Sequence, residues 1–183
     1  MSPPKAVSRE QAFDTEIGFQ VFPPPEGPWY RLQTPDGTGY VLGREKSEQD
    51  KKDGSTVIAE VRFGLINRAQ LSLKNAKDTF QFFEKNMRDP QNTSRFENFK
   101  SDFHVTKFKE ADCVSFEQSG IDKVTKSLQG EKMVMSYRGL LCLHPKDPGR
   151  YISMGFSQRR PVSQKLEDLT ADEKIFYSNL VFY

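Results

Sequence analysis

The sequence is poor in the residues that build most metal and nucleophilic centres. Only two cysteines and two histidines occur in 183 residues. They form neither a Cys-x-x-Cys nor a His-Glu-x-x-His pattern, the spacings that bring zinc ligands together. Glycine-rich phosphate loops and the Gly-x-Ser-x-Gly nucleophile motif are also absent from the sequence. We therefore predict no catalytic, cofactor-binding or metal-binding residues, and we expect a protein that is not an enzyme.

The chain also lacks a long apolar run and a strong charge of one sign. No run approaches the ~20 apolar residues that cross a bilayer, and the N-terminus has no hydrophobic signal region. Twenty-seven basic and 25 acidic residues leave a formal net charge of +2, which is too small for a general attraction to phosphate backbones. We expect a soluble monomer that binds no nucleic acid. The opening Met-Ser-Pro-Pro also leaves open a removed N-terminal membrane tether.

The length of the chain predicts one domain. Hydrophobic residues make up 36% of the chain, and 15 Phe and six Tyr supply large surfaces for a core. Residues 1–12 carry Pro, Ser, Lys and Glu without periodicity, which predicts a mobile N-terminal tether. Residues 13–183 then form a single α+β domain.

The clearest fold signal is a hairpin over residues 133–156. Two strand-like segments flank the sequence His-Pro-Lys-Asp-Pro-Gly. Pro145 and Pro148 each fix φ and remove a backbone donor, and Gly149 can take a positive φ, so the chain should reverse there. A helix follows, in which we expect Thr170 to cap the backbone and Glu173 to complete a capping box.

Other segments complete a mainly antiparallel sheet of about six to eight strands packed by helices, with a three-layer α/β/α-like sandwich as the layout. The β-branched and aromatic residues of 55–66 predict a central strand. Apolar residues at three- and four-residue spacing predict a helix over residues 73–88 that packs on the sheet. Further strands are expected at 17–22, 29–32, 39–42, 103–108, 111–118 and 180–183, turns at 34–37 and around Phe96 and Phe99, and polar connections at 45–54 and 119–131.

The two cysteines can be placed opposite each other. If their strands are antiparallel neighbours connected near residues 127 and 128, Cys113 lies opposite Cys142, Val114 opposite Leu141 and Phe116 opposite Gly139. The predicted apolar face then carries Val114, Phe116, Leu141, Ile152, Met154 and Phe156, with both cysteines on the other face. The pair is either a disulfide of an oxidising compartment or two reduced, buried thiols.

Cys142 and His144 share one face of their predicted strand, which raises the alternative of a thiol enzyme. Residues two apart on a strand are ~6–7 Å apart at Cα, and the sequence assigns no Asn or Asp to orient the histidine. We therefore rank nucleophilic catalysis below a binding function.

The order of elements is similar to a known architecture. Gly18-Phe19, Pro25-Glu-Gly-Pro-Trp29, Tyr137-Arg-Gly139, Tyr151-Ile-Ser153 and the closing Ile175-Phe-Tyr-Ser-Asn-Leu-Val-Phe182 occur in that order. With the central strand and the helix, they resemble the layout shared by the photosystem II extrinsic protein P, the Ran-binding nuclear import factor and small bacterial secreted or lipid-anchored proteins. The resemblance implies an antiparallel sheet between helical layers and proteins that bind partners. It carries over no functional residue.

These observations favour a non-enzymatic accessory or binding domain. We expect an exported bacterial protein or lipoprotein of the periplasm or cell envelope that contacts another macromolecule through a sheet edge or through the loops at 45–54 and 119–131. The alternatives are a cytoplasmic location, a carrier of a small apolar ligand held between the Phe-rich helix and the sheet, and the thiol enzyme.

Overall fold

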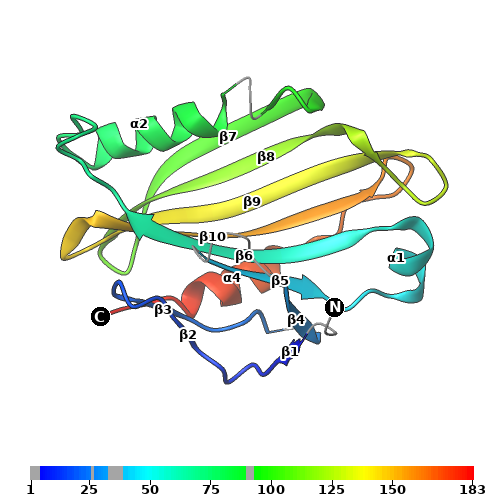
Figure 1. Ribbon diagram of the computed structural model, residues 1–183, viewed down its shortest axis with the longest axis horizontal. Coiled ribbons are helices and arrows are strands. Elements are labelled where there is room, and N and C mark those ends of the chain that lie inside the picture. Colours follow the sequence, from blue (N-terminus) through cyan, green and yellow to red (C-terminus); the bar gives the residue numbers. More distant parts are fainter. Residues whose placement is uncertain (1–4, 26, 33–38, 90–92) are drawn as a thin grey trace.

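The computed structural model describes residues 5–25, 27–32, 39–89 and 93–183. The predicted turn at 34–37 lies outside the described residues. The chain is a mainly antiparallel α+β domain (Figure 1). Its elements are β1 Lys5–Val7, β2 Phe13–Asp14, β3 Phe19–Val21, β4 Trp29–Leu32, β5 Gly39–Arg44, α1 Glu48–Asp53, β6 Thr56–Leu65, α2 Ala76–Met87, β7 Phe96–Phe108, β8 Ala111–Lys126, β9 Lys132–His144, β10 Asp147–Pro161, α4 Thr170–Ser178 and β11 Val181–Phe182.

An eight-stranded sheet dominates the fold. Its strand order is β1-β4-β5-β6-β10-β9-β8-β7, and a separate three-stranded sheet has the order β11-β3-β2. The predicted hairpin is confirmed as β9 and β10, and the predicted central strand is confirmed as β6, which pairs with β5 and β10. The C-terminal strand is also present, but it pairs with β3 in the small sheet.

The predicted register between β8 and β9 is confirmed. Cys113 pairs with Cys142, Val114 with Leu141 and Phe116 with Gly139. The turn between these strands begins after Lys126, as the sequence indicated, although β8 extends well beyond residue 118. Residues 119–126, expected within a polar connection, are therefore part of a long strand.

The predicted face of β10 is wrong. Ile152 pairs with Cys142, so Ile152, Met154 and Phe156 lie on the cysteine face rather than with Leu141. The reason is an irregularity after the turn: Asp147 pairs with His144, but Tyr151 pairs with Leu143. This three-residue shift in register is an odd number, and an odd shift moves every following side chain to the opposite face of the sheet.

Two hydrophobic clusters occupy the two faces of the large sheet. On one face α2 contributes Phe80, which packs with Val114, Phe116, Leu141 and Leu143. On the other face α4 contributes Phe176, which packs in a larger cluster with Met154, Phe156 and residues of the small sheet. Figure 1 shows α2 and α4 on either side of the strands.

The N-terminal part of the chain differs from the expected tether. Lys5–Val7 form β1 and pair with Trp29, Tyr30 and Arg31 of β4. This part of the segment predicted as a mobile tether therefore belongs to the edge of the large sheet. Residues 1–4 lie outside the described residues.

Three local predictions are also corrected. Residues 45–54 contain α1, because Ser47 caps the helix with a capping box through Asp50 and Gly54 ends it at φ 83°.

Phe96 and Phe99 belong to β7 rather than to a helical turn. Thr170 is the first residue of α4 rather than its N-cap, which is Leu169. The N–H of Thr170 donates to the Asp168 carboxylate. Glu173 does not complete a capping box but lies 2.9 Å from Arg138.

Candidate binding surface

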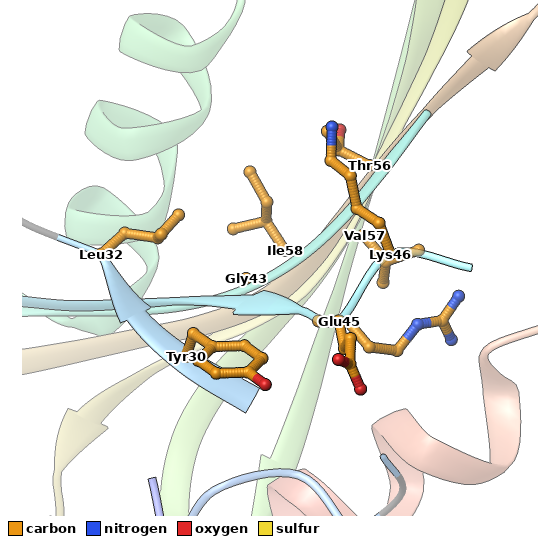
Figure 2. A pocket seen from close by; sticks show the side chains of 9 residues that line it. Tyr30, Leu32, Gly43, Glu45, Lys46, Thr56, Val57 and Ile58 are labelled. Atoms are coloured by element: carbon orange, nitrogen blue, oxygen red, sulfur yellow. The ribbon is translucent and has the colours of Figure 1, made fainter. Parts of the chain in front are cut away.

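A hollow of about 280 Å³ lies on one face of β4, β5 and β6 (Figure 2). Strand alternation explains its position, since Trp29, Leu42 and Val57 point into the core on the α4 side, whereas Tyr30 and Ile58 occupy the opposite face. The α2 cluster on that face is built from β8 and β9, at the other half of the sheet. The residues lining the hollow are Tyr30, Leu32, Gly43, Arg44, Glu45, Lys46, Thr56, Val57 and Ile58.

Gly43 keeps the floor of this hollow low. It pairs with Tyr30 on one side and with Ile58 on the other. A Cβ atom added to Gly43 would lie 3.4 Å from Leu32 Cδ1, which is ordinary van der Waals contact. The backbone therefore tolerates a side chain here, and any larger side chain would occupy space that the hollow now leaves open.

Charged residues border the apolar floor. Arg44, Glu45 and Lys46 follow one another where β5 leaves the sheet. Arg44 Nη2 donates to Glu167 Oε2 at 2.6 Å, so one member of this rim is tied to the segment before α4. An apolar floor with a charged border is the arrangement found where a protein surface receives an apolar anchor residue of a partner.

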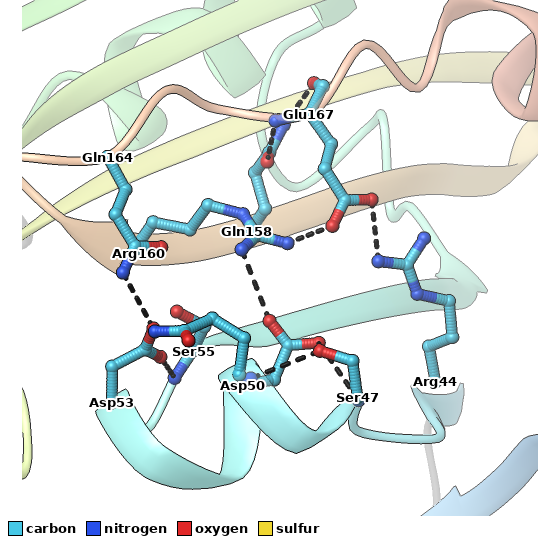
Figure 3. Close-up of polar contacts among 10 residues, drawn as sticks. Arg44, Ser47, Asp50, Asp53, Ser55, Gln158, Arg160, Gln164 and Glu167 are labelled. Carbon is cyan, nitrogen blue, oxygen red and sulfur yellow. Dashed lines mark hydrogen bonds and ion pairs between the residues drawn. The ribbon is translucent and has the colours of Figure 1, made fainter.

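Arg160 connects that rim to α1 (Figure 3). Its guanidinium donates to Asp50 Oδ1 at 3.1 Å and also pairs with Glu167, and the residue is only 8% exposed. Because Asp50 is the capping-box residue of α1, one buried cation holds both the helix and the segment that binds Arg44. A buried guanidinium is stable only when carboxylates compensate its lost hydration.

Asp53 anchors the end of α1 in the same region. Burial opposes ionisation of this carboxylate, but hydrogen bonds from Ser55, Gln164 and Gln49 outweigh that effect and hold its pKa far below its usual value. Asp53 therefore remains charged at neutral pH. It ties α1 to the segment after β10 through Gln164.

The structure brings together the two loops predicted to make contacts. The N–H of Leu128, in the turn between β8 and β9, donates to the carbonyl of Asp53 at 3.0 Å, and the Gln129 amide donates to the carbonyl of Lys52. Leu128 is 73% exposed. The predicted contact segments thus form one end of the molecule, where α1 and the turn lie side by side (Figure 1).

A second ion pair, between the exposed Arg95 and the buried Asp122, supports the strands near this end. Arg95 donates to both carboxylate oxygens of Asp122, at 2.9 Å from Nε and 2.6 Å from Nη2. Burial opposes ionisation of Asp122, but these bonds and those from the N–H groups of Thr125 and Val124 keep its pKa well below its usual value. Arg95 and Asp122 are 27 positions apart in the sequence, so no local pattern pairs them.

The structure joins Cys113 and Cys142 in a disulfide, with Cα atoms 4.1 Å apart. Both residues are fully buried. Cys142 therefore has no free thiol to pair with His144. The His144 ring makes edge-to-face contacts with Phe19 and Phe182. Its Nδ1 accepts from Lys146 N–H and its Nε2 lies 3.1 Å from the Tyr183 carbonyl oxygen, so both ring nitrogens have partners in the fold.

Sequence reasoning missed the hollow and the ion pairs of Arg160 and Arg95. The alternation of side chains along each strand could be followed in the sequence, and it places Tyr30 and Ile58 on one face. The sequence does not show that α2 covers only the other half of that face. Arg160 lies in an Arg-Arg-Pro sequence at the end of β10, which by itself is typical of a solvated strand end. No group of three or more His, Cys, Asp or Glu side chains is arranged to hold a metal ion within the part of the chain that the structure describes.

Comparisons with known proteins do not assign a function. The chain matches no model of a known protein family and no curated protein. Among the described residues, no helix is both long enough and apolar enough to span a membrane. The case for a function therefore depends on the surfaces of the molecule itself.

Proposed function

We propose that this protein is a non-enzymatic binding domain that docks a protein partner on the hollow over β4, β5 and β6. The observation that carries the proposal is the apolar floor formed by Tyr30, Leu32 and Ile58 beside the charged rim at residues 44–46. Anchor residues of a partner contribute most when they fill such a pocket and the surrounding polar rim excludes water. The ion pairs of Arg44 and Arg160 hold the rim in place before binding, which lowers the entropic cost of association.

The volume of the hollow favours a partner side chain over a free ligand. Small-molecule sites typically enclose about 300–1,000 Å³ and bury most of the ligand. This hollow of about 280 Å³ is open to one side and lies just below that range. It matches one large or two small apolar side chains.

A carrier of a small apolar ligand is the second candidate, favoured by the same apolar floor. The site first expected for it, between α2 and the sheet, is occupied by Phe80, Leu141 and Leu143. The hollow is thus the place where such a ligand would bind. Native mass spectrometry of protein isolated from its own host distinguishes the two candidates, because only a carrier retains a small apolar molecule.

We also propose that the protein is exported to the bacterial periplasm or cell envelope. The Cys113–Cys142 disulfide supports this location, because disulfides persist in oxidising compartments and are rare in the cytosol. We further interpret α2, the large sheet and α4 as a three-layer arrangement. The two hydrophobic clusters on opposite faces of the sheet support that layout.

Photo-crosslinking in the native host tests the binding function. A photoreactive phenylalanine analogue is placed at Ile58, in the hollow, and at Leu65, which is 72% exposed at the other end of β6. We expect a discrete crosslinked protein from position 58 that is absent from position 65. The partner is then purified, and its affinity is measured directly.

Filling the hollow provides the decisive variant. Gly43→Leu should lower the affinity for the purified partner at least tenfold, because its side chain occupies the anchor space. Leu65→Met changes an exposed side chain at the other end of β6 and should leave the affinity unchanged. If no discrete product forms at position 58, or if Gly43→Leu binds the partner as tightly as the natural protein, the docking proposal is wrong.

A further inference from the structure

The strand β7 leaves one edge of the large sheet open. It is the last strand in the order, and within the described part of the chain it pairs only with β8. Its regular part runs over residues 100–108, after a register irregularity between Glu97 and Lys100. The opposite edge is formed by the three-residue β1. Long open edges offer unpaired backbone N–H and C=O groups to another chain.

The direction of the backbone groups of β7 can be assigned. Ser115 Oγ on β8 donates to the carbonyl of His104 at 3.4 Å, so this carbonyl points towards β8. Backbone groups of successive strand residues point to opposite edges, so the N–H and C=O of Phe103 and Val105 face outwards. Val105 is 75% exposed, which leaves room for an added strand.

Next to this edge, on the α4 side of the sheet, lies a second hollow of about 250 Å³. A row of charged side chains crosses its floor, because Asp102 pairs with Glu117 and Glu117 with Arg138 in adjacent strands. His104 and Ser115 form the neighbouring pair. From above, α4 contributes Glu173 and Tyr177 to the lining of the hollow.

The charges in this hollow are not balanced. Asp102 and Glu117 stand directly opposite each other, an arrangement of like charges that destabilises a sheet. Arg138 is the one arginine or lysine among the described lining residues, and it already lies 2.9 Å from the Glu173 carboxylate. Burial raises the pKa of Glu173, and the Glu117 and Asp168 charges raise it further against the effect of Arg138. Lys100 lies on the same face two residues before Asp102, outside the lining.

We propose that β7 and this acidic hollow form one docking site for an extended basic segment of a protein partner. The open edge supplies main-chain hydrogen bonds, and the hollow supplies specificity for a Lys or Arg side chain. A residue added opposite Asp102 would place its Cβ atom ~5 Å from that of Asp102, and a long basic side chain reaches from there to Glu117. This site lies at the far edge of the sheet from the hollow over β4, β5 and β6, and it does not depend on that proposal.

A defined probe tests the site. The probe is a fluorescent, acetylated and amidated heptapeptide, Thr-Lys-Thr-Lys-Thr-Lys-Thr, whose side chains alternate as on a strand. Its matched control replaces each Lys with Glu. Binding to the full chain is measured by fluorescence anisotropy at low salt. We expect the Lys peptide to bind saturably with a dissociation constant below ~1 mM, and the Glu peptide to bind at least tenfold more weakly.

Variants separate the two parts of the site. Asp102→Asn with Glu117→Gln should weaken binding of the Lys peptide about tenfold or more, because it removes both free carboxylates. Asp112→Asn is the control, since Asp112 lies on β8 but on the opposite face, beside Lys107. A Lys peptide with an N-methyl group on every residue should not bind in either strand orientation, because none of its residues can donate a backbone N–H to the edge. This measurement requires no change to the protein.

Val105→Pro removes the backbone N–H of residue 105, which points away from β8. The hydrogen bonds between β7 and β8 are made by the neighbouring residues and remain. Val105→Pro should abolish binding while Val105→Ala retains it. The proposal is overturned if the Lys peptide does not bind, if the Lys and Glu peptides bind equally, or if binding survives both the double variant and N-methylation. Since the crosslinking at position 58 probes another surface, failure of this site and failure of the proposed function are distinguishable.

Discussion

Breaking the Cys113–Cys142 disulfide should destabilise the protein by an amount that can be calculated from its position. The bond joins residues with a sequence separation of 29. Closing a loop of that length in the unfolded chain corresponds to about 3.6 kcal/mol at 25 °C. For a chain of this size each kcal/mol shifts the melting temperature by about 2–4 °C, so the reduced protein should melt about 7–14 °C lower.

The assay compares oxidised and reduced protein of identical sequence. Both cysteines are fully buried, so reduction is carried out in urea with a phosphine reductant, followed by refolding in the same reductant. Thiol alkylation and mass spectrometry establish the redox state of each sample. Melting is followed by circular dichroism at one pH, and urea titrations measure the free energy of unfolding.

A variant with alanine at both positions provides the control. Cys113→Ala with Cys142→Ala should melt at a similar temperature with and without reductant, because it has no bond to break. If protein purified without reductant contains two free thiols, the disulfide is not its solution state. If the oxidised and reduced forms melt within about 2 °C of each other, the loop-entropy reasoning is refuted.

Three further changes test the polar framework. Asp122→Asn should lower the free energy of unfolding at pH 7 by about 2 kcal/mol, less than for a fully buried pair because Arg95 is 41% exposed. The folded state lowers the pKa of Asp122, so the difference from the natural protein should shrink as the pH falls from 5 to 2 in urea titrations. Arg160→Lys should cost about 2–3 kcal/mol in the same assay, because one ammonium cannot reproduce the guanidinium contacts to Asp50 and Glu167; an unchanged unfolding midpoint would contradict the role of that network. Glu110→Gly should stabilise the β7–β8 turn by about 0.5 kcal/mol, because Glu110 has φ 69°, and Glu110→Ala should give no such gain in melting temperature.

Local patterns in the sequence were sufficient for several elements. The Pro and Gly residues after His144 end one strand and begin the next, so the β9–β10 hairpin could be recognised from turn chemistry. The apolar spacing around Phe80 identified α2, and the β-branched run identified β6. The register that places Cys113 opposite Cys142 followed from the length of the connection between two strands.

Short polar segments were less predictable. Residues 45–54 carry no apolar stripe, and the capping box of α1 uses Asp50 where Glu or Gln is the usual signal. The helix forms because Asp50 and Asp53 find partners in distant segments: Arg160 and Gln164. A helix of this length is unstable alone, so its presence depends on tertiary contacts.

The candidate sites were decided by tertiary structure. Strand alternation in the sequence determines which residues share a face, but a three-residue register shift after Asp147 reversed that assignment for Ile152, Met154 and Phe156. Likewise, no local pattern shows that α2 covers only part of its face, or that Asp102, Glu117 and Arg138 meet on three strands with Glu173 above them. Periodicity along one segment specifies local conformation, whereas a site arises where separate segments converge, and that convergence is determined by how the whole chain packs.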